Sequence, residues 1–176
     1  MSRAVSTIEA EALEIAAAAP MLAQVRAWSA VNSGSHNLDG LARMAALLAD
    51  RFAALPGKLA LVDTDGHGAN LHLAVRPEAP VQLLLTGHMD TVYGADHPFQ
   101  TVGPIDEAGT INGPGVADMK GGIAVMLAAL RAFESTPLAA RLGYELVINS
   151  DEEVGSPGST PLIASAARGK HAALTY

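Results

Sequence analysis

Three polar segments of this 176-residue chain combine residue types that bind metal ions and transfer protons. They read TGHMD at 86–90, GVADMKGG at 115–122 and SDEEVG at 150–155. Together they supply one imidazole and several carboxylates. Nitrogen and oxygen donors of this kind suit Zn²⁺, Mn²⁺ or Co²⁺. We therefore predict a divalent-metal site built from these three segments.

Spacing suggests roles within the first two segments. His88 and Asp90 lie two residues apart, so in an extended segment both side chains are on the same face. A carboxylate beside a metal-ligating histidine can accept the second ring N–H and fix the tautomer. Asp118 stands in a glycine-flanked turn, from which its two oxygens can each reach a different ion. We predict that His88 and Asp118 bind metal and that Asp90 orients His88.

The third segment contains two adjacent glutamates, Glu152 and Glu153. In an extended segment they point to opposite sides, so that one binds metal while the other faces substrate. A carboxylate beside an activated water serves as general base and later as general acid. Simpler interpretations also fit the residues: a hydrogen-bonded surface histidine, a solvated glutamate pair, or phosphate binding at Lys120-Gly121-Gly122. The last of these lacks the spacing of a P-loop.

The surrounding elements predict how the segments come together. The apolar stretches 81–85 and 144–148 predict buried strands directly before the first and third segments, and 121–133 predicts a helix directly after the second. Ligand sites in open α/β sheets lie beyond the carboxyl ends of the strands. Further helices are expected at 5–19, 20–31, 38–52 and 160–168, and further strands at 59–62, 70–75 and 172–176. This alternation predicts an α/β fold.

Composition excludes several classes of function. Lys and Arg number 11 against 18 Asp and Glu, and a net charge of −7 argues against nucleic-acid and anionic-membrane partners. The absence of Cys excludes disulfides and thiolate metal sites. Glu9, Glu11 and Glu14 interrupt the stretch where a signal peptide needs an apolar run, and no apolar stretch predicts a transmembrane helix. We expect a cytoplasmic protein.

The three segments, in their longer forms TGHMDTV, NGPGVADMKGG and SDEEVGS, closely resemble the co-catalytic di-zinc peptidase family. That family includes glutamate carboxypeptidases, aminoacylases, acetylornithine deacetylase and succinyl-diaminopimelate desuccinylase. The earlier stretch WSAVNSGSHNLDGL looks like the glutamate carboxypeptidase branch. The resemblance covers residues 20–176 and implies a mixed central sheet flanked by helices.

The resemblance also implies a role for each site residue. His88 binds one zinc ion, Asp118 bridges two, and Glu153 binds the second. Asp90 orients His88, and Glu152 is the general base that activates a water bridging the ions. The peptide bond after Asp118 is expected to be cis. The implied reaction is hydrolysis of an amide bond at a peptide C-terminus or in an N-acyl amino acid, with zinc as the metal and Co or Mn as substitutes.

Two departures from the family bear on the domain organisation. The family has one more carboxylate ligand after the glutamate pair and a second ligating histidine near the end of a longer chain. Residues 173–176 resemble the core strand that leads to that carboxylate. We therefore expect residues 1–176 to be the N-terminal portion of a single catalytic domain, without the inserted dimerisation or lid domain and the C-terminal half. Such a chain is expected to be an inactive fragment of a homodimeric parent enzyme.

The alternative is a non-catalytic binding or scaffold module of the same fold. The intact Glu152 argues against it, because a pure binding role needs no base.

Overall fold

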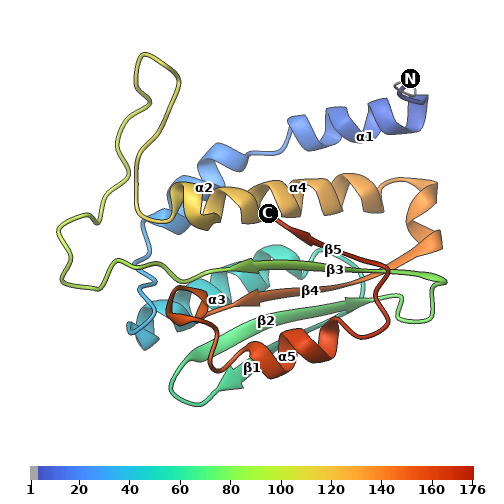
Figure 1. The fold of residues 1–176 in the computed structure, drawn as a ribbon. Coiled ribbons are helices and arrows are strands. Elements are labelled where there is room, and N and C mark those ends of the chain that lie inside the picture. The colour runs from blue at the N-terminus through green and yellow to red at the C-terminus, as the bar shows by residue number, and fades with distance from the viewer. Residues whose placement is uncertain (1–3) are drawn as a thin grey trace.

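The computed structural model describes residues 4–176 and shows a five-stranded mixed sheet with helices on both faces (Figure 1). The strand order is β1-β2-β4-β3-β5. This confirms the predicted α/β class with a mixed central sheet. The strands are β1 (Lys58–Thr64), β2 (Gly68–Val75), β3 (Val81–His88), β4 (Leu142–Asn149) and β5 (Ala172–Thr175). The helices are α1 (Thr7–Ala17), α2 (Met21–Ser29), α3 (Leu38–Phe52), α4 (Gly121–Glu134) and α5 (Thr160–Ala166), with short turns η1 (Val116–Lys120), η2 (Pro137–Arg141) and η3 (Glu152–Val154).

The sheet brings the first and third polar segments side by side. Strand β3 runs parallel to both β4 and β5, whereas β2 is antiparallel to β1 and β4. His88 pairs with Asn149 at the carboxyl ends of β3 and β4. The chain therefore leaves both strands at the same edge of the sheet, immediately before the residues predicted to do chemistry.

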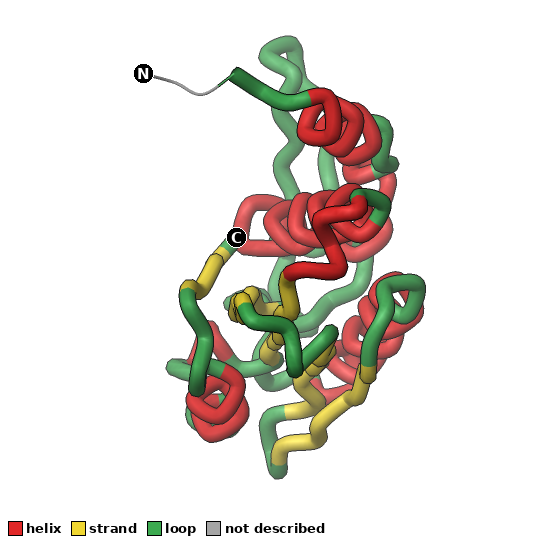
Figure 2. The backbone as a smooth tube through the Cα atoms, turned by 90° about the vertical axis from the view of Figure 1, so that its right-hand side faces the viewer, coloured by secondary structure: helices red, strands yellow, loops and turns green. Residues whose placement is uncertain are grey.

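Helices cover the two faces unequally (Figure 2). Because side chains alternate along a strand, Leu85 and Leu146 join the large core cluster with α2, α3 and α4, whereas Leu84 and Val147 pack against α5. Helix α1 contacts α4 and has no buried residue. The main core thus lies between the sheet and the α3–α4 layer and fixes the turn that leads into α4.

Local chemistry explains where two helices begin. Ser6 and Glu9 form a reciprocal capping box at the start of α1. The Asn37 side chain accepts a hydrogen bond from the Gly40 N–H at the start of α3. The buried residues of α3 recur at helical spacing, so that a single face meets the sheet. They are Gly40, Leu41, Met44, Ala45, Leu48 and Phe52.

Two strands differ from their predictions. The strand predicted at 81–85 is longer in the structure, because main-chain pairing with β4 carries β3 on to His88. Strand β5 lies at the edge of the sheet, and all four of its residues are exposed. The prediction of a core strand there is wrong for this chain, because within residues 4–176 β5 pairs on one side only, with β3. No helix of the described chain is both long and apolar enough to span a membrane.

A charged cluster fastens the segment after α5 to the sheet. The Glu145 carboxylate on β4 accepts a hydrogen bond from Lys170 Nζ at 2.7 Å and lies 2.9 Å from His72 Nε2 on β2. Burial raises the pKa of Glu145, but the bonds to Lys170 and His72 outweigh it and lower the pKa below its usual value. The ionised carboxylate is therefore favoured in the folded state.

Glu145→Gln is expected to lower the free energy of unfolding by about 1 kcal/mol at pH 7. Because the folded pKa lies below the unfolded one, this stabilisation is present above pH 4.5 and is lost as pH falls through the folded pKa. Urea unfolding at pH 7 and pH 3 measures the difference. Glu78→Gln, an exposed glutamate in the turn before β3, is the control and should have no effect. An equal penalty for Glu145→Gln at both pH values would contradict this account.

Candidate metal centre

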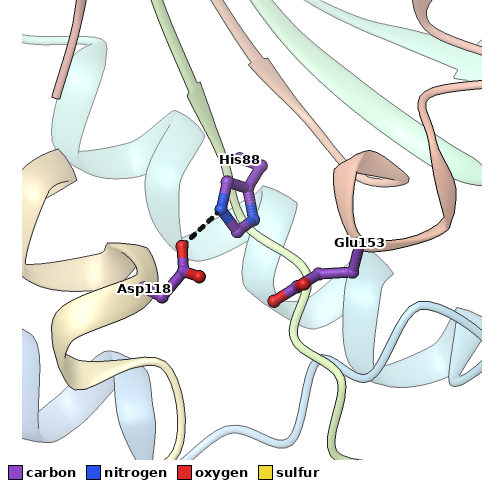
Figure 3. A group of neighbouring side chains, drawn as sticks. All are labelled: His88, Asp118 and Glu153. Atoms are coloured by element: carbon purple, nitrogen blue, oxygen red, sulfur yellow. Dashed lines mark hydrogen bonds and ion pairs between the residues drawn. The ribbon is translucent and has the colours of Figure 1, made fainter.

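His88 ends β3, and Figure 3 shows its ring beside the side chains of Asp118 and Glu153. Its side chain is 6% exposed, and its Nε2 is 2.8 Å from Asp118 Oδ1. Its Nδ1 is 3.3 Å from Asp90 Oδ1 and 3.2 Å from the Asp90 main-chain carbonyl. The structure thus places Asp90 on the side of the ring opposite Asp118, as the predicted orienting role requires.

Asp118 belongs to the turn η1, directly before α4. Gly115 precedes this turn with φ 68°, and a Cβ there would come within 2.9 Å of Thr91 Cγ2. The Asp118–Met119 peptide bond is cis, as the resemblance implies. Met119 Sδ accepts a hydrogen bond from the His88 N–H at 3.2 Å, which fastens the turn to β3. The Asp118 side chain is 74% exposed and so is accessible to an ion.

The two glutamates lie in the helical turn η3, so the alternation expected of an extended segment does not apply to them. The turn still gives them different surroundings. Glu153 joins His88 and Asp118 in a group whose potential ligand atoms, one from each residue, all lie within 4.8 Å of one another. Glu152 is more exposed, and its Oε2 lies 3.9 Å from His88 Nε2.

Asp90 connects the glutamate turn to the histidine. It is fully buried, and its carboxylate oxygens accept hydrogen bonds from the main-chain N–H groups of Glu152 and Glu153, each at 3.1 Å. Ser35 Oγ donates a further hydrogen bond at 2.8 Å. Burial raises the pKa of Asp90, but these bonds and His88 lower it overall, so the carboxylate stays ionised. Sequence reasoning predicted the contact with His88 and missed the contacts with the turn.

The charges of the cluster suit a cation. Burial lowers the pKa of His88, but hydrogen bonds to Asp90 and Asp118 outweigh it and raise the pKa to about 9. Burial raises the pKa of Glu153, and the negative charges of Asp118, Asp90 and Glu152 add to this effect, whereas His88 opposes it. Carboxylates gathered around one imidazole repel one another until a positive charge lies between them. The donor set therefore fits zinc, and equally Mn or Co.

A cavity of about 370 Å³ adjoins this cluster. His88, Asp118 and Glu152 line it on one side, and β5 and α5 contribute Thr175 and Ile163 on the other. A larger cavity of about 450 Å³ lies between α1 and α4, is lined mostly by apolar side chains, and contains none of the five predicted site residues. The cavity next to the cluster is therefore where a substrate would meet these residues.

Asp151 is a buried residue that sequence reasoning gave no role. Its Oδ2 accepts hydrogen bonds from the main-chain N–H groups of Gly158 at 2.7 Å and Ser159 at 3.1 Å, and its Oδ1 accepts from the side chains of Asn149 and Ser159. These bonds close the loop that carries Glu152 and Glu153. The only sequence signal was the density of small polar residues at 149–159, which is typical of turns in general.

The structure contradicts the phosphate-binding interpretation of Lys120-Gly121-Gly122. Lys120 is 1% exposed, and its Nζ donates to the main-chain carbonyls of Trp28 at 3.2 Å and Val31 at 3.1 Å. Burial lowers the pKa of this ammonium group to about 8. The side chain satisfies carbonyls at the end of α2 and is not available to a ligand.

Comparison with known proteins places this geometry in a family. The model of peptidase family M20/M25/M40 matches residues 84–175, more than half of the chain. Carboxypeptidase G2 of Pseudomonas sp. (strain RS-16) is 38% identical over 105 residues, which cover 57% of this chain and 24% of that protein. LysW-lysine hydrolase of Deinococcus radiodurans is 34% identical over 116 residues, which cover 66% of this chain and 29% of that protein. The chain thus matches about a quarter of the length of these relatives.

Solved structures show the same fold. Human carnosine dipeptidase 1 superposes with a TM-score of 0.73 at 19% identity, over 96% of this chain and 39% of that chain. The dipeptidase Dug1p of Saccharomyces cerevisiae gives a TM-score of 0.73 at 17% identity, over 99% of this chain and 41% of that chain. The family match spans all three polar segments, with His88, Asp90, Asp118 and both glutamates inside it. The chain belongs to peptidase family M20/M25/M40.

Proposed function

We propose that the whole protein is a metal-dependent hydrolase that cleaves the amide bond at a peptide C-terminus or in an N-acyl amino acid, in the manner of a glutamate carboxypeptidase. The observation that carries this proposal is the position of Glu152 beside the group formed by His88, Asp118 and Glu153. The similarity to proteins named carboxypeptidase G2 and LysW-lysine hydrolase supports the reaction class.

His88, Asp118 and Glu153 are the residues that would hold zinc, and Asp118 would serve as a ligand common to two ions. A bound zinc ion supplies Lewis acidity, which polarises a carbonyl and makes water a stronger acid. Asp90 holds the His88 ring, so that Nε2 faces Asp118 and is directed into the site.

Glu152 is the proposed general base. Its side chain is 53% exposed and lines the cavity, so its carboxylate can meet a water and a substrate there. It takes a proton from the water as the water oxygen bonds to the scissile carbonyl carbon. It then gives that proton to the amine nitrogen as the C–N bond breaks, which leaves a carboxylic acid and a free amine. The acid loses its proton to solvent at neutral pH and becomes a carboxylate.

We also propose that residues 1–176 form the N-terminal portion of a single catalytic domain. Two zinc ions with about four ligands each need more donors than His88, Asp118 and Glu153 provide. The chain covers 39% of human carnosine dipeptidase 1 and 41% of Dug1p, which is consistent with this proposal. Other parts of the whole protein would then supply the remaining ligands, the contacts that select the substrate, and the interface of a homodimer.

The reaction is tested with the whole protein and a panel of N-acyl amino acids and dipeptides, with release of free amino acid as the measurement. Zinc-loaded protein is expected to turn over at least one member of the panel. Exhaustive chelation should abolish turnover, and added zinc, cobalt or manganese should restore it. Turnover that persists after complete removal of metal would refute the proposal.

A further inference from the structure

The segment 32–37, between α2 and α3, has no part in the mechanism proposed above. It runs beside the residues that follow His88. The Thr91 N–H donates to the Ser33 carbonyl at 3.0 Å, and the Ser35 N–H donates to the Thr91 carbonyl at 3.2 Å. Gly34 and Thr91 form an isolated parallel bridge. The segment is therefore fastened along the stretch that contains Asp90.

Two buried serines of this segment make different bonds. Ser33 is fully buried, and its Oγ donates to the main-chain carbonyl of Met89 at 2.7 Å. Ser35 is 8% exposed, and its Oγ donates to Asp90 Oδ2 at 2.8 Å. Both hydroxyls hold the segment in place, but only the Ser35 bond ends on the carboxylate that contacts the site.

Both carboxylate oxygens of Asp90 accept hydrogen bonds. Its Oδ2 accepts from Ser35 and from the Glu153 N–H, and its Oδ1 accepts from the Glu152 N–H and lies 3.3 Å from His88 Nδ1. A buried carboxylate bonded through both oxygens cannot rotate without breaking hydrogen bonds. Removal of the Ser35 hydroxyl takes away one of two donors to Oδ2 and loosens the carboxylate.

We propose that Ser35 is a positioning residue for the glutamate turn. It fixes the rotation of the Asp90 carboxylate, and the carboxylate in turn holds the main-chain N–H groups of Glu152 and Glu153. The consequence for metal binding rests on the proposed function, because it takes Glu153 as a ligand. The consequence for the two N–H groups depends only on the hydrogen bonds.

Amide hydrogen exchange in the metal-free full chain tests the structural step. Ser35→Ala is expected to speed exchange of the Glu152 and Glu153 amides about tenfold, relative to β4 amides in the same variant. Ser35→Thr keeps a hydroxyl and should exchange like the wild type. Ser35→Val has the shape of threonine but no hydroxyl, and should resemble Ser35→Ala. Ser33→Ala is the matched control and should leave both amides unchanged. Equal acceleration by Ser33→Ala and Ser35→Ala would overturn the positioning role.

Zinc affinity, measured by competition with a chelator, tests the functional step. Ser35→Ala and Ser35→Val are expected to weaken zinc binding about tenfold, whereas Ser35→Thr and Ser33→Ala bind like the wild type. Faster exchange together with unchanged zinc affinity would overturn the ligand role of Glu153, and with it the proposed metal site. Unchanged exchange in Ser35→Ala and Ser35→Val would overturn the role of Ser35 whatever the zinc affinity.

Discussion

Replacing Glu152 with glutamine in the zinc-loaded whole protein is expected to lower kcat about a thousandfold and to leave zinc affinity unchanged. Glutamine has nearly the shape of glutamate but cannot take a proton, and a positioned general base contributes roughly 10²–10⁴-fold to the rate. Glu152 lies outside the group of potential ligand atoms, so its loss should spare the metal. Steady-state kinetics and a zinc assay on the same preparation measure both quantities.

The neighbouring residue provides the matched control for this experiment. Glu153→Gln removes the same charge one position along the same turn, but from within the group formed with His88 and Asp118. It is expected to lower zinc affinity, and excess zinc should recover part of its activity. Turnover by Glu152→Gln within tenfold of the wild type would exclude the base role. Loss of zinc by Glu152→Gln would instead make that residue a ligand.

Asp118→Ala is expected to weaken zinc binding by about a hundredfold or more, while the fold stays intact. Asp118 provides the oxygen nearest His88 Nε2, so its removal takes a donor from the centre of the site. Its side chain is 74% exposed, so no core contact is lost, and repulsion with Glu153 is relieved. Calorimetric titration of the 176-residue chain with zinc measures affinity, and urea unfolding measures stability.

The same titration tests the proposed domain organisation. The wild-type chain is expected to bind at most one zinc ion tightly, because three ligands do not complete two sites. Asp65→Ala, at an exposed position in the turn between β1 and β2, is the charge control and should bind like the wild type. Two tight sites in the wild-type chain would contradict the proposal that further ligands lie elsewhere in the whole protein. Unchanged affinity in Asp118→Ala would remove this residue from the site.

The sequence alone predicted the parts of the molecule that depend on local patterns. Strand and helix positions followed from hydrophobic runs and turn residues, and the helix expected at 38–52 is α3. The meeting of the segments around His88 and Glu153 followed from a general rule, since parallel strands end at the same edge of a sheet. The roles of the site residues still await the experiments above.

Other features depended on contacts between residues far apart in the chain, and only the tertiary structure decided them. The motif around Lys120 is compatible with a phosphate site, and packing against α2 turns the ammonium group inward instead. Residues 172–175 have the composition of a core strand, and their place in the strand order makes them an exposed edge. Local sequence cannot predict either feature, because it does not contain the distant residues that a side chain contacts in the folded protein.

The contacts of Asp90 show the same division within the site. Its spacing from His88 was enough to predict their contact, because residues two apart in an extended segment share a face. Its bonds to Ser35 and to the Glu153 N–H span 55 and 63 residues, and no spacing rule reaches that far. They exist because a carboxylate that folding has buried must find hydrogen-bond donors wherever the packed chain presents them. The sequence thus predicted which groups meet at the candidate site, and the packing determined what holds them in place.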